Sequence, residues 1–181
     1  MIAAARIVWL LTGGVWATHA LVGFAEPEYW NPVTTLDFAA VWLYSAGFLT
    51  LALTATLLGR LVPTRSVRRA AIVMAIAALV TGVANGIEDG LGVRTAGTVY
   101  VIGALALLVG TLVLVVALAR AGPARLAWMT GGLAIGLLLV SIGGGLVILG
   151  MLGALAVRPA WFLVADPEPP IPAAPARRSV E

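Results

Sequence analysis

Four polar residues interrupt a stretch of the chain that is otherwise almost entirely aliphatic. Asn85, Glu88, Asp89 and Arg94 lie within VTGVANGIEDGLGVRTAGTVY, residues 80–100, although only 10% of the 181 residues are charged. A carboxyl group in an apolar setting can act as a general acid or base, and a carboxylate can also neutralise a bound cation. The same residues fit an ordinary polar turn at a membrane surface, where an exposed ion pair contributes at most about 1 kcal/mol.

The single histidine is the second candidate for chemistry. His19 lies about five residues inside the end of the first apolar stretch. A polar side chain at that depth is costly unless it has a partner, and ionisable groups there are often functional. With Asp37 or Glu88 it would be suited to acid–base catalysis on a lipophilic substrate. A structural hydrogen bond to a neighbouring helix explains His19 equally well. The candidate catalytic residues are therefore His19, Asp37 and Glu88.

Aromatic residues accompany these groups and favour a binding site. Aromatic faces attract cations and contact apolar groups, so together with carboxylates they suit a ligand with an apolar body and a polar or cationic head. Helical spacing places Thr81, Asn85 and Glu88 on one face of their segment. Asp37 also fits a purely structural role, because a carboxylate in the first turn of a helix is stabilised by the helix dipole. The candidate ligand-binding residues are Trp16, His19, Glu26, Asp37, Trp42, Tyr44, Thr81, Asn85, Glu88 and Tyr100.

The elements that position these residues are predicted to be membrane-spanning helices. Hydrophobic residues make up 61% of the chain and the mean hydropathy is +1.06, which is more apolar surface than a soluble core of this size can bury. A helix needs about 20 apolar residues to cross the hydrocarbon layer. Five stretches qualify, at residues 7–24, 36–58, 70–87, 96–119 and 126–157. Because the connections are short, the sequence predicts an all-α integral membrane protein, an up-down bundle of five transmembrane helices.

The distribution of charge predicts how this bundle is oriented. Arginines gather near the N-terminus and in the second and fourth connections, whereas carboxylates occupy the first and third. The positive-inside rule then places the N-terminus in the cytoplasm and the C-terminus outside it, in a bacterial cytoplasmic membrane. If the first span were a cleaved signal peptide, four helices would remain, although its tryptophans and histidine argue against this. Residues 1–157 form one polytopic domain, and residues 158–181, with six of the ten prolines, form a mostly disordered tail.

Small residues recur every seven positions in the last two predicted spans. Such a seam lets two helix backbones approach closely. We expect the two seams to pack against each other, and a homodimer or a larger membrane complex through the same glycines is the second option. The residues are Ala96, Gly103, Gly110 and Ala117 in one span, and Gly136, Gly143 and Gly150 in the other.

Several classes of function are disfavoured. The chain has no cysteine and one histidine, so we expect no metal or other cofactor, and no motif indicates a nucleic-acid partner. The leading hypothesis is a non-enzymatic protein that binds a hydrophobic or amphiphilic ligand, or serves as an accessory subunit, through an outward-facing aromatic and acidic pocket. Its partners would be membrane lipid and a lipophilic small molecule. The alternative is a small membrane enzyme of isomerase, cyclase or hydrolase type that uses carboxylate and histidine acid–base chemistry on a lipophilic substrate.

Overall fold

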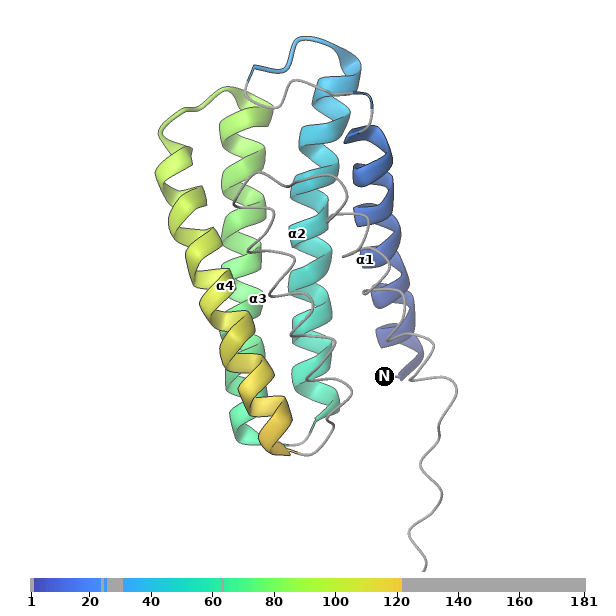
Figure 1. The fold of residues 1–181 in the computed structure, drawn as a ribbon, viewed down its shortest axis with the longest axis vertical. Coiled ribbons are helices and arrows are strands. Elements are labelled where there is room, and N and C mark those ends of the chain that lie inside the picture. The colour runs from blue at the N-terminus through green and yellow to red at the C-terminus, as the bar shows by residue number, and fades with distance from the viewer. Residues whose placement is uncertain (1, 24, 26–30, 63, 122–181) are drawn as a thin grey trace, which may run out of the picture.

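Four long helices make up the part of the chain that the computed structural model describes, residues 2–23, 25, 31–62 and 64–121 (Figure 1). They are α1 (Ile2–Gly23), α2 (Thr35–Leu61), α3 (Arg65–Asn85) and α4 (Ala96–Ala121). A π-helical turn, η1 (Gly86–Gly90), continues α3 without a break. The fifth predicted span with its glycine seam, the proline-rich tail and Glu26 lie outside the described residues.

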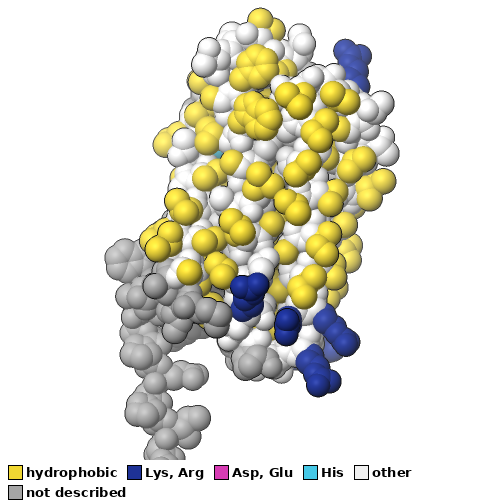
Figure 2. All heavy atoms as spheres, turned by 180° about the vertical axis from the view of Figure 1, so that it is seen from behind, with side chains coloured by type: hydrophobic (Ala, Val, Ile, Leu, Met, Phe, Trp, Pro, Cys, Tyr) yellow, Lys and Arg dark blue, Asp and Glu magenta, His cyan; other side chains and the backbone are white. Residues whose placement is uncertain are grey.

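The described helices are compatible with a membrane bundle. α2, α3 together with η1, and α4 are each long and apolar enough to cross a membrane, and α1 contains a shorter apolar run at Ile7–Gly23. Large apolar side chains face outward along the helices, among them Ile102, Leu105 and Val109 of α4. Figure 2 shows this apolar lateral surface, with basic side chains confined to the two ends. An aqueous surface would not favour so much exposed hydrocarbon, whereas lipid does.

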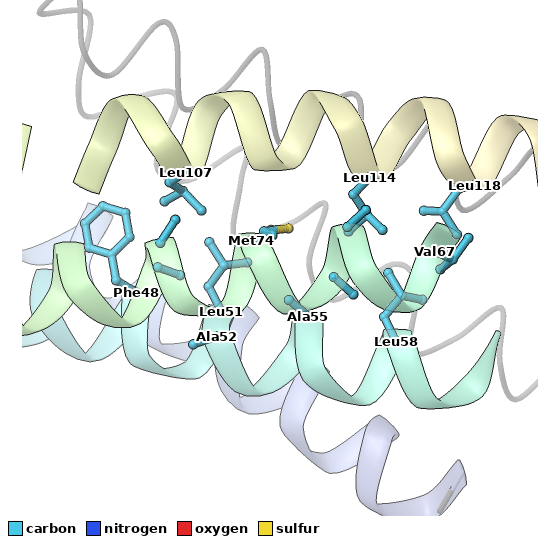
Figure 3. Packing of buried hydrophobic residues seen from close by; sticks show 14 of the residues in the cluster. Phe48, Leu51, Ala52, Ala55, Leu58, Val67, Met74, Leu107, Leu114 and Leu118 are labelled. Carbon is cyan, nitrogen blue, oxygen red and sulfur yellow. The ribbon is translucent and has the colours of Figure 1, made fainter. Parts of the chain in front are cut away.

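The helices lie side by side in their order along the chain, as Figure 1 shows. α1 packs on α2, α2 on α3, and α3 on α4. Each helix runs antiparallel to the next, as short connections require. In the core, Leu107, Leu114 and Leu118 of α4 point toward α3 (Figure 3). Polar pairs also join neighbours, for example the hydroxyls of Thr12 in α1 and Thr54 in α2, which lie 2.9 Å apart.

The glycine seam of α4 packs against α3, not against the fifth span as the sequence analysis expected. A Cβ added to Gly103 would lie 2.8 Å from Thr81 Oγ1, and one added to Gly110 would lie 3.2 Å from the Cα of Met74. Met74 and Thr81 are seven residues apart, as Gly103 and Gly110 are. Because the spacing is the same in both helices, each of these side chains of α3 packs over one glycine of α4. The seven-residue pattern was correctly interpreted as a packing face, but its partner was wrong.

The ends of α3 differ from the predicted ones. The helix begins at Arg65, before the apolar run that starts near residue 70, because arginine is a good helix former and can extend its charge toward water. At its other end the helical conformation continues through η1, beyond the predicted end at residue 87. The actual end is at Gly92, whose φ of +71° favours glycine.

Candidate functional site

The predicted site residues that the structure describes lie toward one end of the bundle, where α1 ends, α2 begins, α3 passes into η1 and α4 begins. We call it the acidic end, because it contains all the carboxylates of the described ranges, Asp37, Glu88 and Asp89. Asp37 lies in the first turn of α2, and the other two lie in η1. The alternation of helix directions brings these segments together.

An aromatic cluster fills the contact between α1 and α2. Trp16 and His19 of α1 are each only 1% exposed. The ring of Trp16 lies edge-on to Tyr44 and Phe48, with centroids 5.8 and 5.4 Å away, and the ring of His19 lies 5.2 Å from that of Tyr44. Gly47 makes this possible, since a Cβ there would lie 2.7 Å from Trp16 Cε2. Trp16 and His19 are therefore part of a packed helix interface.

Three of the predicted ligand-binding residues form contacts that hold helices together. The hydroxyl groups of Tyr44 and Tyr100 lie 3.1 Å apart and connect α2 to α4. Asn85 Nδ2 donates a hydrogen bond of 3.0 Å to Ser45 Oγ, which connects α3 to α2. Buried polar groups in an apolar bundle need such partners, and pairs of this kind stabilise helix association.

Thr81 and Ser45 show the limits of reading polar residues from the sequence. Thr81 is fully buried, donates to the carbonyl oxygen of Ala77 at 2.8 Å and packs over Gly103. Ser45 was not predicted as a site residue, although it accepts the buried hydrogen bond from Asn85. A lone serine in an apolar helix gives little signal, because its hydroxyl commonly bonds to its own backbone.

Asp37 stabilises the start of α2. Its Oδ2 accepts hydrogen bonds from the backbone N–H groups of Thr34, at 2.8 Å, and Val33, at 3.1 Å. In return Thr34 Oγ1 accepts from the N–H of Asp37 at 3.2 Å. This reciprocal pair is a capping box, and it also places a carboxylate at the positive end of the helix dipole. Of the two interpretations drawn from the sequence, the geometry supports the structural one.

Glu88 of η1 packs against α4, the described helix farthest from α1 in the bundle. A Cβ added to Gly97 would lie 2.8 Å from the carboxyl carbon of Glu88. Glu88 over Gly97 is thus the third contact of this kind, after Met74 over Gly110 and Thr81 over Gly103. No hydrogen bond or ion pair joins His19 to Glu88 in the part of the chain that the structure describes. His19, Asp37 and Glu88 thus belong to three separate contacts, between α1 and α2, at the start of α2, and between η1 and α4.

Trp42 combines exposure with a fixed position. Its side chain is 48% exposed, yet its indole ring lies on the backbone of η1. A Cβ added to Gly90 would lie 2.9 Å from Trp42 Cζ2, and one added to Gly86 would lie 3.1 Å from Cζ3. The turn that the ring covers carries Glu88 and Asp89, both half-buried. An exposed aromatic surface and two carboxylates therefore share one short turn, and π-helical turns often occur at functional sites.

Comparisons with models of known protein families, with curated proteins and with solved structures gave no match to this chain. Among the described residues, no three histidine or carboxylate side chains come together as metal ligands.

Proposed function

We propose that this chain is a non-enzymatic integral membrane protein that binds lipophilic organic cations at its acidic end. The observation that carries this proposal is the indole of Trp42, half-exposed and packed on the π-helical turn that bears Glu88 and Asp89. A ring face attracts a cation by about 0.5–2 kcal/mol, depending on how far the cation is removed from water. Because the ring is held by Gly86 and Gly90, little side-chain freedom is lost on binding.

The carboxylates supply the charge for such a ligand. Glu88 and Asp89 are half-buried, so their attraction for a cation is screened less than it would be in open water. The apolar part of the ligand would contact the lipid-facing side of α2, where Phe38 and Trp42 are exposed one turn apart. A cation with an apolar body can be attracted by the carboxylates of η1 and can also contact this apolar side of α2.

The alternative of acid–base catalysis has less support. It requires His19, Asp37 and Glu88 around one substrate, but Asp37 caps α2 and Glu88 packs over Gly97. Assembly as an accessory subunit through the glycines of α4 also has less support. Gly103 and Gly110 already contact α3 and so cannot receive a helix of another chain.

The proposal includes the membrane orientation inferred from the sequence. Five transmembrane helices in a bacterial cytoplasmic membrane, with a cytoplasmic N-terminus, would place the acidic end outside the cell. The arginines whose side chains are described support this orientation, since Arg94 lies at the acidic end and the other five lie at the opposite end. Those five are Arg60, Arg65, Arg68, Arg69 and Arg120.

Tetraphenylphosphonium and tetraphenylborate form a suitable pair of probes, because they have nearly the same shape and opposite charges. The full chain in nanodiscs of phosphatidylcholine should bind radiolabelled tetraphenylphosphonium saturably in equilibrium dialysis, and tetraphenylborate should not compete. Trp42→Leu should weaken binding by roughly 2- to 30-fold, which corresponds to the stated cation–π energy. Leu53→Ala, at an exposed position further along α2, is the matched control and should leave the affinity unchanged. Equal binding of the two ions, or an unchanged affinity for Trp42→Leu, would refute the proposal.

A further inference from the structure

The end of the bundle opposite the acidic end carries a second charged surface, which we call the arginine end. It is formed where α2 ends, α3 begins and α4 ends, and all its guanidinium groups are exposed. Figure 2 shows basic side chains gathered there. Asp37 and Arg60, at the two ends of α2, are separated by 23 residues (60 − 37), or about 35 Å of helix. The described carboxylates are thus too far away to neutralise this surface. Its residues are Arg60, Arg65, Arg68, Arg69 and Arg120.

The arginines of α3 lie where helix electrostatics disfavours them. Arg60 and Arg120 are in the last turns of α2 and α4, where the negative end of the helix dipole stabilises a cation. Arg65, Arg68 and Arg69 are in the first two turns of α3, at the positive end of its dipole. A bound anion would remove this repulsion.

The start of α3 also lacks the cap that α2 has. Its first turn contains no acidic residue, and its N-cap residue, Thr64, makes no side-chain capping bond. The Oγ1 atom of Thr64 is buried and has no hydrogen-bond partner in the described part of the chain. The first-turn N–H groups of a helix have no acceptor within the helix, and the Thr64 hydroxyl has no partner in the described part of the chain. Helix N-termini with free N–H groups are suited to phosphate.

We propose that the arginine end binds the headgroup phosphates of anionic phospholipids, with one phosphate held at the start of α3 by Thr64, Arg68 and Arg69. The exposed apolar side chains that follow these arginines along α3 indicate that the phosphate belongs to a lipid. Ile72 and Val73 follow Arg69 at helical spacing and are 46% and 53% exposed. Acyl chains of a lipid whose phosphate contacts Arg69 would lie along them. Clusters of four or more basic residues next to membrane helices are a known basis for attraction to anionic lipids.

This inference concerns the end opposite Trp42 and does not depend on the proposed function. Native mass spectrometry of the full chain in a neutral detergent can test it, with phosphatidylglycerol and phosphatidylcholine of identical acyl chains as probes. The protein should retain phosphatidylglycerol at least fivefold more than phosphatidylcholine, and millimolar inorganic phosphate should not displace it. Arg68→Gln combined with Arg69→Gln should abolish most of this preference. Arg94→Gln removes one arginine from the acidic end and should preserve the preference.

A second variant keeps the test decisive if the double substitution prevents folding. Thr64→Val replaces the hydroxyl group with a methyl group of similar size and should reduce retention of phosphatidylglycerol severalfold, while the far-ultraviolet circular dichroism stays unchanged. Equal retention of the two lipids by the wild-type chain would overturn the proposal. So would an equal loss of retention in Arg94→Gln, or full retention in Thr64→Val. Displacement by inorganic phosphate would show a free-anion site and would also overturn it.

Discussion

Replacing Gly103 by alanine places a methyl group where α3 and α4 touch. The added Cβ would lie 2.8 Å from Thr81 Oγ1, and 3.2 and 3.3 Å from the backbone N and Cα of Thr81. Thr81 cannot easily move away, because it is fully buried and its hydroxyl group donates to Ala77 O at 2.8 Å. The methyl group therefore forces the two helices apart or strains the side chain of Thr81.

The expected change in the free energy of unfolding follows from two opposing effects. Overpacking a close contact costs about 1–3 kcal/mol, and alanine regains about 0.5–1 kcal/mol over glycine within a helix. Gly103→Ala should therefore destabilise the protein by up to about 2.5 kcal/mol. Gly14→Ala is the matched control, since a Cβ at Gly14 has no neighbouring atom within 4 Å. That variant should be as stable as the wild type or up to about 1 kcal/mol more stable.

Unfolding in mixed micelles with increasing sodium dodecyl sulfate, followed by far-ultraviolet circular dichroism, measures both variants. Gly103→Ala should lower the midpoint, whereas Gly14→Ala should leave it unchanged or raise it. Adding Thr81→Ala to Gly103→Ala should restore part of the lost stability, because the clash with Oγ1 is removed. Our account of the α3–α4 contact is wrong if Gly103→Ala is as stable as Gly14→Ala.

Three further substitutions separate structural from functional roles. Asp37→Ala should lower the free energy of unfolding by about 0.5–2 kcal/mol in the same micelle assay, through loss of the helix cap, and should leave the affinity for tetraphenylphosphonium unchanged in equilibrium dialysis. Asn85→Ala should cost about 1–3 kcal/mol, and its combination with Ser45→Ala should cost less than the sum of the two, because no buried group then remains without its partner. Tyr44→Phe and Tyr100→Phe should likewise be less than additive in a double-mutant cycle of unfolding free energies.

The helices themselves were predictable to within a few residues over most of their length. Membrane thickness sets a minimum length for an apolar run, and α2 and α4 differ from the predicted spans by at most three residues at either end. The start of α3 was missed, because hydropathy does not report on the arginines with which the helix begins. The continuation of the helix through η1, beyond residue 87, was missed because neighbouring helices stabilise glycine-containing turns that would be breaks in isolation.

The candidate site was predicted less completely than the fold. Helical spacing indicated that Thr81 and Asn85 point into the bundle, and both are buried. Spacing alone does not identify which helix a face contacts, so the pairing of Asn85 with Ser45 and the packing of Glu88 on Gly97 could not be foreseen. Trp42 was included for its residue type, whereas its fixed position depends on the π-helical turn, which no local pattern indicated.

The position of a bound lipophilic cation is the most direct test of the proposed function. A photoreactive phosphonium probe can be crosslinked to the full chain in nanodiscs, and the modified peptides can be identified by mass spectrometry. Our account predicts modification at Trp42 and within Gly86–Gly90, and loss of that modification when excess tetraphenylphosphonium is present. Modification spread evenly along the lipid-facing helices, or concentrated at the arginine end, would contradict it.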